Sequence, residues 1–444
     1  MIYKNNILDR NVVFFIILMP FIFILGPTFV EIFCFFLVIT FLFKAKSSFY
    51  KTNMKYIYLF LVFFLFLLLR SLVFSLEFEK IRSVVFYFRF LFYVLALIYF
   101  INQINYKHKY FIKIIFFGFL LLILDSIIQY YYGKNIFNTP LYDQYRASSF
   151  FGKELILGSF LFRMLPFILI LCILCKLDLK KNFIKLSIFF SLYFFAVLIS
   201  GERTSFFLLL LTIFLLIVLL KDFRKILLYS LIFFLFINLI FSFSNKNPFD
   251  RMFKYTFNQI VSKQAPLKVN EKSSNLDLNE KSSNLELSGK SNLLSDYYIF
   301  SREHHGHYVI ALRMFLDNPI FGQGPRSFRY ICSEEKFIKY DGICTTHPHN
   351  TYLQLLAETG LVGFFFIFLL FSFSTKELIK KFFYNLKYKK KDNNFLQIKF
   401  ISLIAIFVCL FPLVPSGNFF NNWLSFVYYY PISFYIYSIH KNKN

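Results

Sequence analysis

The chain has 444 residues, of which 58% are hydrophobic and only 16% are charged, and its formal net charge is +25. It contains 70 Phe and 14 Gly. Such a composition leaves too little polar surface to cover a soluble core, so it excludes a soluble domain and predicts an integral membrane protein.

Apolar windows follow one another along most of the chain. A hydrocarbon core of ~30 Å requires roughly 20 residues of helix, and we therefore predict an all-α, polytopic integral membrane protein with about 12 transmembrane helices. Gly26 and Pro27 separate the first two windows, which are short, so a hairpin or re-entrant pair is an alternative there. The windows lie at 11–25, 28–43, 56–76, 84–102, 110–131, 155–175, 183–199, 204–220, 224–243, 351–374, 395–414 and 418–438.

Lysine and arginine are concentrated in alternate connections, at residues 44–55, 107–109, 176–185, 221–225 and 376–391. Because basic residues mark cytoplasmic loops, both termini are expected to be cytoplasmic. This bias accounts for most of the net charge. No aromatic and basic pattern lies outside the membrane, so nucleic acid is not an expected partner.

The same alternation divides the chain into helices 1–9 at residues 1–243, a large outer loop at 244–350, and helices 10–12 at 351–444. Within the loop, "NEKSSNLDLNEKSSNLEL" repeats a nine-residue polar unit. Such a segment cannot bury a core, so we predict a disordered insert at about 270–295. The following "YYIFSREHHGHYVIALRMFLDNPIFGQGPRSFRYIC" is expected to be ordered, with a helical stripe at Tyr308, Ala311, Leu312 and Phe315 and then a turn.

Cysteine usage agrees with this division. Cys332 and Cys344 are the only two cysteines of the outer loop, whereas the other four lie in apolar windows. In an oxidising compartment the two could form a disulfide, and two free thiols remain the alternative, because spacing alone does not determine pairing.

Charged residues inside the apolar windows indicate a polar site, because they are costly in lipid. Once the chain is oriented, four of them fall in the outer half of four different spans, and Arg203 lies with Glu202 at the outer mouth of another. Converging guanidinium groups predict an anion site that suits phosphate oxygens. The alternative is structural pairing, for example between Asp125 and Arg89 or Arg163. The four residues are Arg70, Arg89, Asp125 and Arg163.

The segment "THPHNTYLQLLAETG" stands directly before the tenth window. Thr351 and Gln354 have capping-box spacing, so a helix is expected to begin at Asn350 or Thr351, with His349 at its mouth and Glu358 one turn beyond Gln354. The positive end of the helix disfavours imidazolium, so His349 is a neutral candidate general base. The alternative is a histidine that only caps or packs.

Five of the seven histidines lie in the outer loop, but "HHGH" followed some forty residues later by "HPH" fits zinc-ligand spacing poorly, and we predict no metal. The "GQGP" segment at 322–325 lacks the preceding strand of a nucleotide-binding loop and is expected to be a turn.

Three segments, "SGERTS", "ALRMFLDNPIFGQGPRSF" and "HPHNTYLQLLAETGLVGF", together resemble the O-antigen ligase and polymerase superfamily of bacterial envelope glycosyltransferases. The resemblance covers residues 201–364. It implies an all-helical membrane fold of the GT-C kind in the inner membrane, without a metal or other cofactor. It also implies that a glycan is transferred from undecaprenyl pyrophosphate to a sugar hydroxyl at the periplasmic face.

The resemblance also assigns residues. The family's first arginine falls on Arg203 and its histidine on His349, while Arg302 is the nearest match to its second arginine. Arg313 and Arg326 are alternatives for that role, because the tryptophan that often follows in the family is absent. In this interpretation the arginines, joined by Arg89 or Arg163, bind the pyrophosphate, and His349 takes the proton from the attacking hydroxyl. Asn350, Gln354 and Glu358 are supporting residues.

Three functions remain open. A ligase transfers the polymer to lipid A core, and this is the preferred hypothesis; a polymerase transfers it to another lipid-linked repeat unit. The expected partners are thus a lipid-linked glycan, one of these acceptors and the membrane lipids. A transporter of lipid-linked sugars is disfavoured, because no pair of related halves with broken spans is visible.

Overall fold

The protein is described by a computed structural model covering residues 7–102, 110–243, 246–255, 257–258, 302–338, 343–388 and 392–443. The described residues are predominantly helical and contain no strand, which confirms the all-α prediction. The predicted insert at 270–295 lies outside them.

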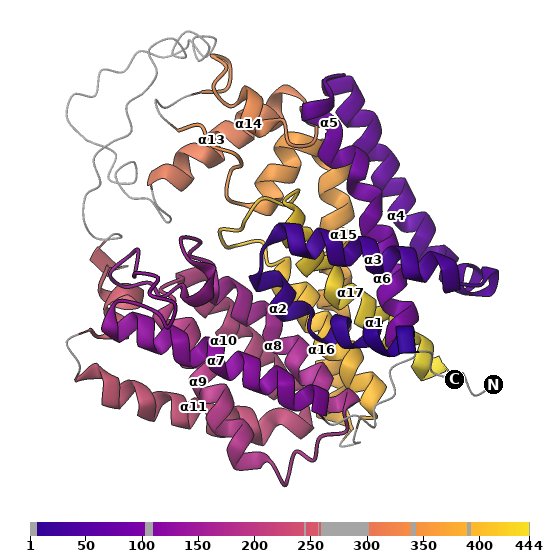
Figure 1. Cartoon of the computed structure of the whole chain (residues 1–444). Coiled ribbons are helices and arrows are strands. Elements are labelled where there is room, and N and C mark those ends of the chain that lie inside the picture. Colours follow the sequence, from indigo (N-terminus) through magenta and orange to yellow (C-terminus); the bar gives the residue numbers. More distant parts are fainter. Residues whose placement is uncertain are drawn as a thin grey trace, which may run out of the picture.

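The first half of the chain forms the indigo to magenta helices of Figure 1. They are α1 (Ile7–Ile17), α2 (Met19–Ile24), α3 (Pro27–Lys44), α4 (Ser47–Phe74), α5 (Phe78–Val85), the 3₁₀ turn η1 (Phe86–Phe88), α6 (Arg89–Ile101), α7 (Tyr110–Tyr132), the 3₁₀ turn η2 (Ser149–Phe151), α8 (Leu157–Leu174), α9 (Phe183–Ile199), α10 (Arg203–Leu219) and α11 (Lys221–Ser242).

The second half forms the helices that run from pink to yellow in Figure 1, with α13 and α14 on one side of the molecule. They are the π-helix η3 (Asp250–Lys254), α13 (Arg302–Asp317), α14 (Phe328–Ile331), α15 (Thr351–Lys387), α16 (Asn394–Cys409) and α17 (Asn422–Lys443).

Every predicted apolar window coincides with one helix or with consecutive short helices. Among the described residues, seven helices are long and apolar enough to cross a membrane, counting 78–101 as one, and α9, α10 and α16 are shorter apolar helices. Twelve crossings therefore stay a prediction. Between the first two windows, Gly26 has a φ of 103° and Pro27 begins α3, so the chain turns there as a hairpin or re-entrant pair would require.

The helices differ in which faces they bury. In α8, 89% of the residues are buried, and it packs against α9, α10 and α16. By contrast, only 17% of the most apolar window of α4 is buried, and its exposed side chains are mostly leucine, valine and aromatic. Such an apolar outer face suits contact with lipid, and the buried α8 brings its polar first turn into the interior of the bundle.

Helix α15 is interrupted at Gly360, whose φ is 61° and ψ −163°. The turn that follows α13 fills the interruption. The amides of Gln323 and Gly324 donate to the carbonyls of Ala357 and Glu358 over 2.9 and 2.8 Å. These carbonyls would otherwise lack partners, since a helix break removes its i to i+4 bonds. In return, residues 361 and 362 donate to the carbonyls of residues 319 and 320.

Arg70 supports this turn from α4. Its Nε donates to the Phe321 carbonyl over 3.1 Å, and its Nη2 donates to that of Gly322. Asp125 also has a structural role. Its carboxylate accepts from the Ile136 amide and the Ser149 hydroxyl, so the alternative that paired Asp125 with Arg89 or Arg163 is wrong.

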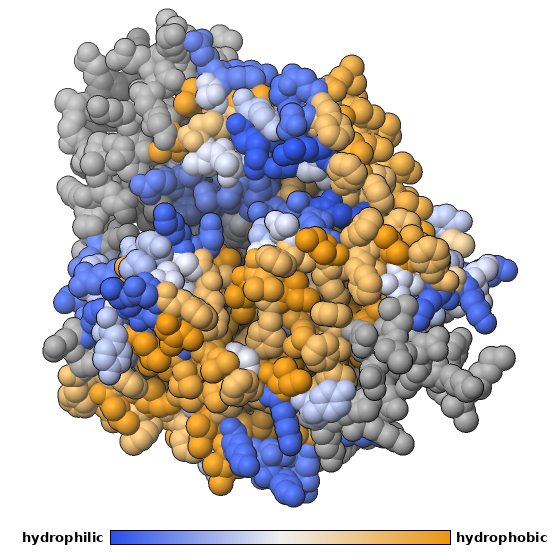
Figure 2. All heavy atoms as spheres, in the orientation of Figure 1, coloured by the Kyte–Doolittle hydropathy of each residue, from blue (hydrophilic) through white to orange (hydrophobic). Residues whose placement is uncertain are grey.

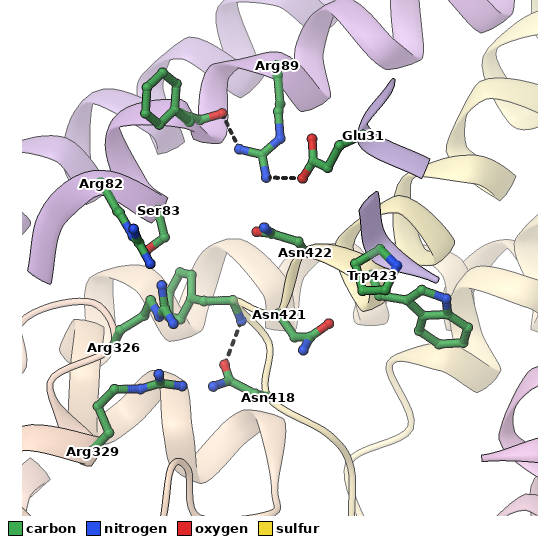
Figure 3. Close-up of a pocket in the computed structure, with 13 residues that line it drawn as sticks. Glu31, Arg82, Ser83, Arg89, Arg326, Arg329, Asn418, Asn421, Asn422 and Trp423 are labelled. Atoms are coloured by element: carbon green, nitrogen blue, oxygen red, sulfur yellow. Dashed lines mark hydrogen bonds and ion pairs between the residues drawn. The ribbon is translucent and has the colours of Figure 1, made fainter. Parts of the chain in front are cut away.

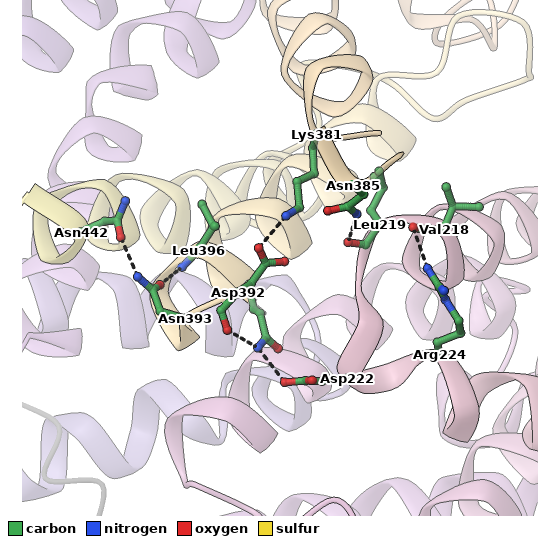
Figure 4. Close-up of polar contacts among 11 residues, drawn as sticks. Val218, Leu219, Asp222, Arg224, Lys381, Asn385, Asp392, Asn393, Leu396 and Asn442 are labelled. Atoms are coloured by element: carbon green, nitrogen blue, oxygen red, sulfur yellow. Dashed lines mark hydrogen bonds and ion pairs between the residues drawn. The ribbon is translucent and has the colours of Figure 1, made fainter. Parts of the chain in front are cut away.

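A second group of polar contacts joins the far end of α15 to its neighbours (Figure 4). Lys381 Nζ lies 2.5 Å from Asp392 Oδ1, and both side chains are at most 10% exposed. Gln397 bridges the Asp392 carbonyl and Asp222 Oδ2. Asn385 donates to the Leu219 carbonyl at the end of α10. These contacts connect α10, α15 and α16 away from His349.

Candidate functional site

A cavity of about 1350 Å³ lies between α8, α10, the segment before α15, and the segment between α16 and α17. Figure 2 shows hydrophilic side chains gathered in a hollow above the mainly apolar lower part of the molecule. Apolar side chains also line the cavity, among them Phe23, Phe207, Val408 and Phe411. The cavity can therefore accommodate both a charged group and a hydrocarbon chain.

Arginines dominate the polar lining of this cavity. Five arginines face only two glutamates, Glu154 and Glu202, so the lining has an excess of positive charge. Such an excess favours an anion with several oxygens. The arginines are Arg146, Arg163, Arg203, Arg251 and Arg329.

Glu202 fixes the position of Arg203. Its carboxylate accepts from the Gly158 and Ser159 amides over 2.7 and 3.1 Å and from the Ser205 hydroxyl over 2.9 Å. The carboxylate therefore caps the first turn of α8, where unpaired amides favour negative charge. Burial raises the pKa of Glu202, and these hydrogen bonds and Arg146 oppose the shift. Arg203 follows as the first residue of α10, at the rim of the cavity.

Gly201 allows the side chains of Arg146 and Arg251 to pack against the backbone that precedes Arg203. Its φ is 68°, and a Cβ there would lie 2.6 Å from the Tyr145 carbonyl oxygen and 2.7 Å from side-chain carbons of Arg146 and Arg251. Arg251 Nε donates to the Gly201 carbonyl over 3.0 Å, and its Nη1 lies 3.3 Å from Asp143. A glycine before Glu202 is therefore needed for the packing of this arginine cluster.

The four arginines assigned to pyrophosphate binding do not all lie together. Arg163 and Arg203 line the main cavity. Arg89 does not; it lines a smaller neighbouring cavity, where its Nη2 lies 2.9 Å from Glu31. Arg302 begins α13, but its side chain lies outside the described part of the structure.

His349 lies in a cluster of imidazoles. Its ring centroid is 4.1 Å from that of His347 and 5.2 Å from those of His304 and His307. Burial, reinforced by His304 and His307, lowers the pKa of His349 to about 4. Burial and the surrounding histidines also lower the pKa of His307 to about 4 and that of His347 to about 3. The three rings are therefore neutral near pH 7, and His349 lines the main cavity.

Helix α15 begins at Thr351, as the sequence predicts, with Asn350 as its cap. Asn350 Oδ1 accepts from the Tyr352 and Leu353 amides over 3.0 and 3.1 Å. The expected capping box does not form, because Asn350 already binds these amides and the Gln354 side chain is buried elsewhere. His349 has a φ of 56°, a left-handed conformation that non-glycine residues adopt only when the surroundings hold it.

The supporting residues form a buried network behind His349. Gln354 Nε2 donates to Glu358 Oε2 and Asn418 Oδ1 over 3.0 and 2.9 Å. Glu358 Oε1 accepts from the Phe328 amide at the start of α14 over 3.1 Å. Because these side chains connect α14, α15 and the segment before α17, they determine how the cavity walls meet.

Cys332 and Cys344 are joined by a disulfide with their Cα atoms 5.5 Å apart. The bond lies in an apolar cluster that includes Ile310, Met314 and Phe328. The helix predicted over this part of the loop is present as α13, but its predicted buried face is partly wrong. Leu312 is 44% exposed, because the face that packs on α15 and the disulfide is formed by residues 307, 310, 311 and 314.

Residues 188–368, from α9 to beyond the break in α15, match the family described as O-antigen ligase. The chain thus contains an O-antigen ligase segment, which covers 181 of its 444 residues. No curated protein matches it. Within the described residues, no group of three or more His, Cys, Asp or Glu side chains is arranged to hold a metal ion.

The O-antigen ligase segment contains Arg203, Arg251, Arg302, Arg329 and His349. Arg146, Arg251 and Arg329 also line the cavity but were not predicted from the sequence, because they lie outside the apolar windows and outside the motifs of the resemblance. They fall in connections that the sequence predicts to be outer, where the positive-inside rule makes a basic residue unusual, and this could have indicated them.

Proposed function

We propose that the protein is an O-antigen ligase-like glycosyltransferase, which moves a glycan from undecaprenyl pyrophosphate to a sugar hydroxyl of lipid A core. The reaction takes place at the periplasmic face of the inner membrane, with both termini of the chain cytoplasmic, and needs no metal. The observation that carries the proposal is a single cavity with clustered arginines and a neutral histidine in its lining.

In this mechanism Arg203 and Arg163, with Arg146 and Arg251 nearby, bind the pyrophosphate. Planar guanidinium groups match its oxygens and stabilise the charge that develops as the anomeric C–O bond breaks. The apolar side chains of the lining contact the polyprenyl chain. The large volume, about 1350 Å³, leaves room for sugar residues of both substrates.

His349 is the general base. The acceptor oxygen attacks the anomeric carbon, the bond to pyrophosphate breaks, and the hydroxyl proton passes to the imidazole. An imidazole with a pKa of about 4 is a weak base. A bound pyrophosphate raises that pKa, because nearby negative charge favours imidazolium, and so brings it closer to the working pH. A single displacement inverts the anomeric centre.

Purified variants test the roles of these residues. His349→Ala should lower turnover by roughly 10²- to 10⁴-fold with little change in donor binding, the usual effect of losing a general base. Arg203→Lys should weaken donor binding, since an ammonium lacks the guanidinium fork. His347→Ala is the matched control from the same cluster and should cause a modest loss. An inactive His347→Ala beside an active His349→Ala would reverse the assignment.

The second candidate is a polymerase, whose acceptor is a lipid-linked repeat unit and therefore also carries a pyrophosphate. It is favoured by a further arginine-lined cavity beside the main one. A deletion strain separates the two functions. Loss of all lipid A-attached polymer, with intact polymer left on the carrier, indicates a ligase, whereas single repeats on lipid A indicate a polymerase. Normal lipopolysaccharide would refute both.

A further inference from the structure

A second cavity of about 540 Å³ adjoins the main one and is also rich in arginine (Figure 3). Four arginines line it, together with a single carboxylate, Glu31, and several asparagines. They come from α5, α6 and the segment that contains α14. The arginines are Arg82, Arg89, Arg326 and Arg329.

The carboxylate is already engaged. Arg89 binds Glu31 through Nη2 over 2.9 Å and the Phe86 carbonyl through Nη1 over 2.7 Å. Arg82 forms an exposed ion pair with Glu79, at 3.4 Å. Within the described residues, Arg326 and Arg329 form no ion pair, and the buried Nε atoms of both, like that of Arg89, have no hydrogen-bond partner. The cavity therefore has unsatisfied donors and uncompensated positive charge.

Arg326 and Arg82 come from different elements and point toward one another in Figure 3. Burial lowers the pKa of Arg326. The neighbouring charges of Arg329 and Arg82 add to this shift, whereas Tyr330 and Glu358 oppose it. Arg326 also has a φ of 62°, which is unfavourable for a non-glycine residue. Like charges held together in a strained, half-buried geometry are stabilised by a bound anion, and guanidinium groups suit phosphate oxygens.

We propose that this smaller cavity binds a phosphate or pyrophosphate group of the acceptor substrate. Arg329, Asn418, Asn421 and Trp423 line both cavities, so the acceptor's anion and the donor's pyrophosphate lie on either side of a shared wall. An acceptor held there can extend its sugar hydroxyl into the main cavity toward His349. This inference rests on the proposed function, and it assigns the acceptor to the class of phosphorylated glycans.

Binding stoichiometry tests the inference without turnover. A short-chain polyprenyl pyrophosphate glycan is titrated into the purified protein in nanodiscs, and bound copies are counted by native mass spectrometry. Two sites are expected. Arg203→Gln should weaken one of them, and Arg82→Gln and Arg326→Gln should each weaken the other by at least about tenfold, as expected for a lost charge-assisted hydrogen bond. Lys80→Gln, on the same helix as Arg82 but outside both cavities, should retain both sites.

The outcomes separate the two proposals. No binding at all would refute the proposed function and the inference together. One lipid pyrophosphate site that responds to Arg203→Gln, together with no binding of phosphorylated core that Arg82→Gln or Arg326→Gln weakens, would overturn the inference and leave the function standing. A competing arm uses phosphorylated and dephosphorylated core oligosaccharide. If the phosphorylated core, but not the dephosphorylated core, displaces the lipid from the Arg82-sensitive site, the anion is a core phosphate. If neither core displaces the lipid, the anion is the lipid pyrophosphate.

Discussion

Substituting Gly360 with alanine should uncouple α15 from the turn that interrupts it. A Cβ at this position would lie 2.3 Å from the Ile320 carbonyl oxygen and 2.6 Å from the Gly322 amide nitrogen. Both contacts are with backbone atoms, so no side chain can rotate away to relieve them. The φ of 61° and ψ of −163° also lie in a region that is essentially restricted to glycine.

The magnitude follows from these contacts. The unfavourable backbone conformation costs about 1–3 kcal/mol. Separating the turn from α15 also breaks four hydrogen bonds between residues 319–324 and 357–362. At about 1 kcal/mol each, these bonds bring the loss of unfolding free energy to several kcal/mol. Because the turn leads directly to Arg326, the cavity walls should shift and turnover should fall as well.

Gly133→Ala is the matched control. Gly133 has a φ of 82°, but a Cβ added there would meet no atom within 4 Å. Its substitution therefore measures the cost of the backbone conformation without any steric clash. Thermal unfolding of the detergent-solubilised variants, followed by intrinsic fluorescence, should show a clearly larger fall in Tm for Gly360→Ala than for Gly133→Ala. Equal shifts, with unchanged glycan transfer, would refute the reasoning.

Three further predictions concern pH, the disulfide and a buried ion pair. The folded-state pKa values of His307, His347 and His349 lie below the ordinary 6.5, so the free energy of unfolding should fall as pH decreases from about 6.5 to about 3 and then level off. Tm should follow this course, and His307→Gln/His347→Gln should flatten it. Alkylation of the denatured, unreduced protein should label four cysteines, and reduction should raise the number to six; six labels at the outset would exclude the disulfide. Lys381→Met should lower the unfolding free energy by about 3–5 kcal/mol by leaving Asp392 buried and unpaired, and Lys381→Met/Asp392→Leu should recover most of it; no recovery would contradict this assignment.

The positions of the helices could be predicted because the length of each apolar window can be read from the sequence. The start of α15 was also predictable, since Asn350 and Thr351 are residue types that favour helix caps. The buried face of α13 was not, because apolar residues occur on more than one of its faces and packing against α15 decides between them. Periodicity alone cannot resolve such a choice.

Residues of the candidate site were predictable where the residue type is unusual for its position in the sequence. Arg203 and Arg163 stand out as charges at or within apolar windows, and both line the main cavity. The ion pair of Arg89 with Glu31 could not be predicted from the sequence, because it depends on how α3 and α6 pack. Likewise, nothing local in the sequence shows that Gly360 interrupts α15. The hydrogen bonds that replace those lost at the break are made by a turn some forty residues earlier in the chain.

The break in α15 explains how the two cavities keep their geometry. His349 and Arg326 both have a positive φ, and such strain, of about 1–3 kcal/mol each, persists only where surrounding contacts hold it. Here the Asn350 cap fixes the segment after His349, and the hydrogen bonds at Gly360 fix the turn before Arg326. The disulfide joins two points of the intervening chain, within an apolar cluster that includes residues of α13. One unit thus carries the candidate base and an arginine of the smaller cavity, so loosening any of these three constraints should affect both cavities together.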